Sequence, residues 1–92
     1  MPSGQSPRQS LLARYGMLDR RLQNMRKDIP ETATGAVTTV DRALQSYTNT
    51  MSSIAETLRT QQPDYKALRR RLNTIENGLD TNAAKLSRAR QQ

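Results

Sequence analysis

The 92-residue sequence contains no cysteine, histidine, tryptophan or phenylalanine, and three tyrosines are its only aromatic residues. Without cysteine and histidine, the chain cannot form a zinc finger, a disulfide framework, a c-type haem attachment, or a Cys-His or Ser-His-Asp catalytic group. No apolar run exceeds three residues, which is too short for a membrane-spanning helix or the centre of a signal peptide. We therefore expect a protein without a metal, a cofactor or a transmembrane segment, and by default a cytoplasmic one.

The acidic residues also argue against catalysis. We expect all eight carboxylates to be exposed and close to arginines, where burial cannot raise a pKa towards neutrality. The sequence has neither a glycine-rich phosphate loop nor a carboxylate cluster with metal-ligand spacing. We predict that the protein is not an enzyme.

Apolar residues recur in alternating steps of three and four along three stretches, which is the heptad pattern of a helix with one packed face. These three seams occupy residues 11–29, 33–58 and 65–89. Pro30 and Pro63, each followed by an acidic residue, suit the first turn of the second and third helices. Because no stretch of five or more residues alternates between apolar and polar, we expect no strand.

These signals predict one all-α domain, an antiparallel (up-down-up) bundle of three helices with coiled-coil-like packing. The expected helices span residues 10–29, 31–61 and 64–90, and they follow a disordered tail at residues 1–9 that is polar and contains two prolines. Small, uncharged residues flank the second seam, and charged residues flank the other two. We therefore expect the second helix to lie in the middle, between two outer helices.

Two of the helix ends have an alternative position in the sequence. Thr38, followed three residues later by Asp41, forms a capping-box pattern that offers a later start for the second helix. Asn77 and Gly78 offer an early end for the third helix at a glycine cap. Because the third seam continues in phase after this pair, we favour an unbroken helix there.

The expected helices differ in length, which predicts an open groove. The first has about 21 residues and the second about 31, or roughly 31 Å against 46 Å at 1.5 Å per residue. If the first helix packs backwards from Pro30, it ends near Met51 and leaves the far tip of the hairpin without a third wall. The apolar residues at this tip that we select as the partner interface are Ile54, Leu58, Tyr65, Leu68 and Leu72.

An open groove between two helices is a common binding site for an amphipathic helix. We therefore predict a protein-protein interaction module, such as an adaptor, a chaperone-like protein or an assembly subunit. The groove would hold a helix of a partner protein or a second copy of the chain. The alternative is that the hairpin tip is frayed and binds nothing. Asn82, the one polar residue in the third seam, would either set the helix register or oligomeric state as a buried amide, or lie solvated at a frayed end.

The net charge of +7 offers an alternative function. Residues 1–29 and residues 63–92 each carry +4, and a basic patch gathers at Lys66, Arg69, Arg70 and Arg71. Such a surface could bind nucleic acid or another acidic surface. We do not favour this function from the sequence, because the charges are spread around the helices and all three tyrosines occupy seam positions, where none is free to stack on a base.

One segment resembles a known family. The stretch from Pro63 to Leu79, which begins Pro-Asp-Tyr-Lys-Ala-Leu and ends Ile-Glu-Asn-Gly-Leu, is similar to the second hairpin helix of the small cytoplasmic co-chaperones of type III secretion needle subunits. The resemblance covers about a fifth of the chain. It implies a helical hairpin that holds an export substrate, and it adds a co-chaperone or structural component of a bacterial secretion apparatus as a further alternative.

Overall fold

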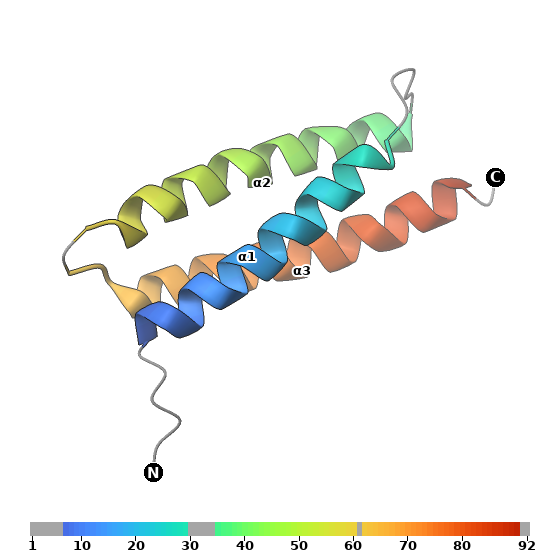
Figure 1. The fold of residues 1–92 in the computed structure, drawn as a ribbon. Helices are drawn as coiled ribbons and strands as arrows, with labels where there is room; N and C mark the ends of the chain where they lie inside the picture. Colours follow the sequence, from blue (N-terminus) through green and yellow to red (C-terminus); the bar gives the residue numbers. More distant parts are fainter. Residues whose placement is uncertain (1–6, 30–34, 61, 91–92) are drawn as a thin grey trace, which may run out of the picture.

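The computed structural model describes residues 7–29, 35–60 and 62–90, which form three α-helices and no strand. The helices are α1 (Pro7–Lys27), α2 (Ala36–Leu58) and α3 (Tyr65–Arg90). Figure 1 shows them side by side in an up-down-up arrangement, so that α2 runs antiparallel to both α1 and α3. The predicted all-α three-helix bundle is confirmed. None of the described helices is long and apolar enough to cross a bilayer.

The helix ends differ from the predicted ones at α1 and α2. Helix α1 begins at Pro7, three residues early, because proline in a first turn loses no hydrogen bond. The last part of the predicted tail is therefore helical, and residues 1–6 lie outside the described residues. Helix α2 begins only after Gly35, whose φ of 60° cannot continue a helix, and it ends at Leu58 rather than near residue 61.

Helix α3 matches its prediction within one residue at its start and runs unbroken through Asn77 and Gly78. Its first turn is capped by Asp64, whose Oδ1 accepts a hydrogen bond from the backbone N–H of Ala67 at 3.0 Å. A short acidic side chain at this position satisfies a backbone donor that the helix itself leaves unpaired, which fixes the place where α3 begins.

The three predicted seams meet in one hydrophobic core. Each helix packs against the other two, so the expectation of α2 as a middle helix is wrong. The charged flanks of α1 and α3 did not prevent their contact, because some of these charges pair across the two helices. The buried core residues are Leu11, Leu18, Leu22, Met25, Val40, Leu44, Met51, Ile54, Leu58, Leu68, Leu72, Ile75 and Leu79.

The open groove predicted at the hairpin tip does not exist in this fold. Helix α1 has 21 residues and α2 has 23, or roughly 31 Å and 35 Å, so α1 reaches the tip. The guanidinium Nη1 of Arg8 donates a hydrogen bond to the carbonyl oxygen of Thr60 at 3.4 Å, which joins the start of α1 to the turn after α2. Of the residues assigned to the partner interface, Ile54, Leu58, Leu68 and Leu72 are buried and Tyr65 is half-buried against the core.

A polar contact crosses from α2 to α3 inside the bundle. Tyr47 lies against Gly78, where an added methyl group would overlap with the tyrosine hydroxyl and ring. Asn82 is only 4% exposed, so it does not lie at a frayed, solvated end. Its Nδ2 donates to the Gly78 carbonyl oxygen at 2.8 Å and to the Tyr47 hydroxyl at 3.4 Å. Gly78 is therefore the residue that allows the phenol to approach the α3 backbone.

We expect Gly78→Ala to destabilise the protein by about 1 to 3 kcal/mol, because the new methyl group must displace Tyr47 from a packed position. The matched control is Gly16→Ala in α1, where an added Cβ meets no atom within 4 Å. That substitution should stabilise the protein by about 0.5 to 1 kcal/mol through helix propensity. Urea unfolding of both variants tests the contact, and equal effects of the two substitutions would contradict it.

Candidate functional site

Two ion pairs join α1 to α3 across the surface of the bundle. Arg14 Nη2 lies 2.6 Å from Glu76 Oε1, and Arg21 Nη2 lies 2.6 Å from Asp80 Oδ1. Arg14 Nη2 also donates to Asn73 Oδ1 at 2.5 Å. These pairs are partly exposed, so each contributes only about 0.2 to 1 kcal/mol to stability. Their larger consequence is electrostatic, because Glu76 and Asp80 are the only carboxylates in the sequence of α3.

The predicted basic patch is divided by the structure. Lys66, Arg69 and Arg70 are exposed, and none of the three pairs with another described residue. Arg71 is half-buried instead, and its Nη2 donates to Ser53 Oγ of α2 at 3.0 Å. The difference follows from helix geometry, because successive residues point about 100° apart and Arg71 therefore turns towards α2.

Two further cations, Lys85 and Arg88, are exposed near the other end of α3. At about 100° per residue, Arg88 points in nearly the same direction as Lys66 and Arg70. The basic patch predicted from the dense arginine run does not include these two residues, although their helical spacing from Lys66 places both on the outward half of α3. We define the α3 basic face as Lys66, Arg69, Arg70, Lys85 and Arg88.

Helix α2 carries much less positive charge than the α3 basic face. The only charged residues within it are Asp41, Arg42 and Glu56. Several of its hydroxyl groups are occupied by the helix itself, since Thr50 and Thr57 donate to carbonyl oxygens four residues earlier at 3.2 and 3.1 Å. A threonine bonded in this way offers mainly its methyl group to solvent. The positive charge of the protein is therefore concentrated on α1 and α3.

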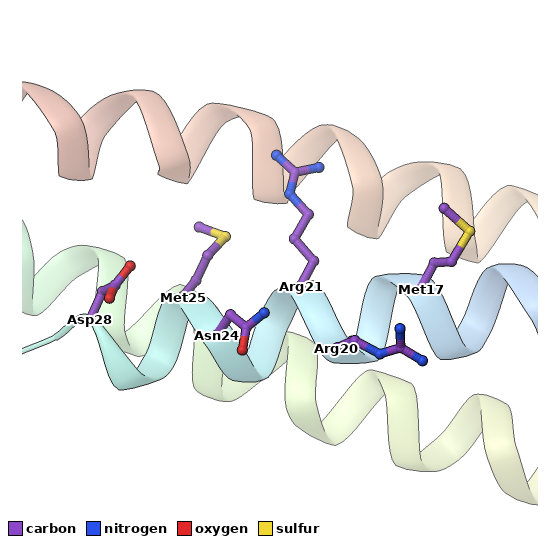
Figure 2. A pocket seen from close by; sticks show the side chains of 6 residues that line it. All are labelled: Met17, Arg20, Arg21, Asn24, Met25 and Asp28. Atoms are coloured by element: carbon purple, nitrogen blue, oxygen red, sulfur yellow. The ribbon is translucent and has the colours of Figure 1, made fainter.

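A shallow hollow of about 390 Å³ lies on the outer side of α1. Figure 2 shows its lining, in which Arg21 extends towards α3 and Arg20 does not. The other lining residues are Met17, Asn24, Met25 and Asp28. Asp28 is the only acidic residue in this lining. Within the described ranges, no three acidic side chains gather closely enough to hold a metal ion.

A second hollow, of about 220 Å³, lies where α1 covers the hairpin tip. It is lined by Arg8, Leu12, Tyr15, Ala55, Leu58 and Arg59. Burial raises the pKa of the Tyr15 phenol above its usual 10.0, the negative charge of Asp19 raises it further, and Arg59 opposes the shift. This small space is what remains of the predicted groove once α1 has packed over it.

Comparisons with protein-family models, with curated proteins and with solved structures returned no match. The resemblance of the third helix to secretion co-chaperones stays untested.

Truncating a core residue at the hairpin tip should unfold the bundle rather than open a binding site. Leu58 is 3% exposed, so Leu58→Ala should lower the free energy of unfolding by about 2 to 5 kcal/mol. Leu12 is 46% exposed, and Leu12→Ala should cost less than about 1 kcal/mol. Circular dichroism during urea titration measures both. Equal and small losses would mean that Leu58 lies in an accessible groove.

The phenol of Tyr15 should make stability depend on pH in alkaline solution. Because its pKa is raised in the folded chain, the neutral phenol stabilises the fold below pH 10.0, and this contribution is lost as the pH rises through the raised pKa. Tyr15→Phe should therefore lose less stability than the unmodified chain between pH 8 and about pH 10.5. Urea midpoints at the two pH values test this, and equal losses would contradict it.

Proposed function

We propose that this protein is a non-enzymatic binding module that holds an acidic macromolecule against the α3 basic face. One observation carries the proposal. Both carboxylates of α3 are held by arginines of α1 at 2.6 Å, whereas the five cations of the basic face form no ion pair with the described residues. The bundle therefore presents cations on α3 without competing anions from the same helix.

The ion pairs support the proposal because each places a positive charge of α1 beside a carboxylate of α3. A free carboxylate at Glu76 or Asp80 would lie between the two ends of the basic face and repel an acidic partner. In water, one cation attracts one anion about 5 Å away with only roughly 0.8 kcal/mol. Binding therefore requires several contacts at once, and the five exposed cations of the α3 basic face can supply them.

Capture of a partner helix has less support from this geometry. It requires an open apolar groove, but the residues that we selected for one are buried or half-buried within the bundle. The exposed large apolar residues in the described part of the chain are Leu12 and Met17, both on α1. Their indices differ by five, which places them on different sides of the helix. They do not form one apolar surface.

Removing three cations from α3 should weaken polyanion binding strongly. We expect the triple substitution Lys66→Gln, Arg69→Gln and Arg70→Gln to lower the affinity for a fluorescent heparin fragment at least 100-fold at about 0.1 M salt, because three counterion-releasing contacts are lost. Fluorescence anisotropy measures the affinity. Far-ultraviolet circular dichroism verifies that the variant keeps its helices.

The matched control removes the same number of charges from the other two helices. Arg20→Gln, Lys27→Gln and Arg42→Gln also lower the formal net charge from +7 to +4. All three residues are exposed and lie outside α3. This control should lose less than about tenfold in affinity, because a distant charge is screened within about 10 Å at 0.1 M salt. Equal losses in the two triple variants would show that net charge, not the α3 face, governs binding.

A further inference from the structure

The hollow between the start of α1 and the end of α2 combines cationic groups with an apolar wall. Its volume is about 220 Å³. The residues that line it come from the two helices and from the C-cap of α2, and they are Arg8, Leu12, Tyr15, Ala55, Leu58 and Arg59. None of these residues is acidic, and none belongs to the α3 basic face. The hollow is therefore separate from the surface of the proposed function.

The two guanidinium groups of this lining have no anionic partner among the described residues. Arg8 is half-buried, and its Nη1 donates to the neutral carbonyl oxygen of Thr60 at 3.4 Å. Arg59 is exposed and takes part in neither of the ion pairs found in the described part of the chain. A guanidinium group binds a carboxylate through paired, charge-assisted hydrogen bonds. Either arginine can therefore take the carboxylate of a ligand without first losing an ion pair of its own.

The phenol of Tyr15 adds a neutral donor at the same place. The positive charge of Arg59 acts to lower the pKa of this phenol, so the guanidinium lies near the phenol oxygen. Burial and the charge of Asp19 outweigh this effect and hold the pKa above 10.0, so the phenol keeps its proton at neutral pH and can donate it to an anion. Asp19 does not line the hollow, and within the described residues it forms no ion pair with either arginine.

The size and the apolar wall of the hollow restrict the ligand further. Leu12, Ala55 and Leu58 supply aliphatic surface. A cavity of roughly 150 Å³ holds one benzene ring, so a space of about 220 Å³ admits a ring with one small substituent. An inorganic anion would gain nothing from the aliphatic wall, and an uncharged aromatic molecule would gain little from the guanidinium groups. A small anion with an apolar body uses both.

We infer that this hollow binds a small monocarboxylate with an apolar body, which packs against Leu12 and Leu58 while its carboxylate lies at Arg8 and Arg59. The inference goes beyond the proposed function, because it adds a second class of ligand at a site that shares no residue with the α3 basic face. Benzoate is a suitable probe. It has about nine non-hydrogen atoms, and a dissociation constant of about 1 mM is within reach of a ligand of that size.

The test is a titration of the ¹⁵N-labelled protein with sodium benzoate at neutral pH and constant ionic strength, followed by two-dimensional NMR. The titration extends to about 20 mM, well above the expected dissociation constant. The amide signals of residues 8–15 and 55–59 should shift and saturate. Benzamide has nearly the same shape without the charge, and it should bind at least about tenfold more weakly because it cannot form charge-assisted hydrogen bonds as an anion.

Two variants locate the ligand in the hollow. Arg59→Gln should weaken benzoate binding at least about tenfold, because one charged donor is lost. Ala55→Leu places a larger aliphatic side chain in the hollow and should abolish binding. The matched control, Arg42→Gln, removes one exposed charge from α2 outside the hollow and should keep the affinity of the unmodified chain. Far-ultraviolet circular dichroism verifies that each variant keeps its helices.

Three results would each overturn the inference: no shifts at the highest benzoate concentration, equal binding of benzamide, or shifts as large on the α3 basic face as in the hollow. Equal losses of affinity in Arg59→Gln and Arg42→Gln would overturn it as well. None of these results bears on heparin binding by the α3 basic face, which the triple variants measure separately. The failure of this inference and the failure of the proposed function are therefore distinguishable.

Discussion

The burial of three apolar seams against one another is the constraint on which the rest of this structure depends. Only 34% of the residues are apolar, so the core can form only if each helix contributes its seam along nearly its whole length. The early start of α1 at Pro7 and the late start of α2 after Gly35 make the two helices similar in length. The core therefore extends to the hairpin tip, and no open groove remains there for a partner helix.

Because the core takes nearly all the large apolar residues, the outer surface is left to polar and charged side chains. Their arrangement is uneven. Arg14 and Arg21 of α1 hold the two carboxylates of α3, and Arg71 is directed to Ser53. The five cations of the α3 basic face are exposed. The same packing that closes the core also brings α1 close enough to α3 for these pairs. Core packing and the basic face are in this way linked.

The contact of Tyr47 with Gly78 and Asn82 constrains how α2 and α3 align. Heptad seams alone allow two helices to slide past each other in steps of seven residues with little change in apolar contact. Such a slide would bring Arg71 or Lys85 opposite Tyr47 in place of Gly78, and either residue has a side chain where the phenol must lie. The single glycine and the buried amide therefore distinguish this register from its neighbours.

Local periodicity determined much of this protein. The steps of three and four residues identified the three helices and the side of each that is buried, because these contacts repeat within one or two turns and need no knowledge of distant residues. Leu22, Leu44 and Leu72, all in predicted seams, are fully buried. The unbroken α3 and the buried position of Asn82 also agree with the phase of its seam.

Only the tertiary structure decided which helix ends coincide and which charges are paired. The ends depend on a backbone angle at Gly35 and on a proline that starts α1 three residues early, and neither leaves a periodic signal. The pair of Arg14 and Glu76 joins residues 62 positions apart, and no local pattern predicts such a pair. The sequence therefore supplied the cations of α3, and the packing of α1 against α3 decided that both carboxylates within that helix are paired with arginines.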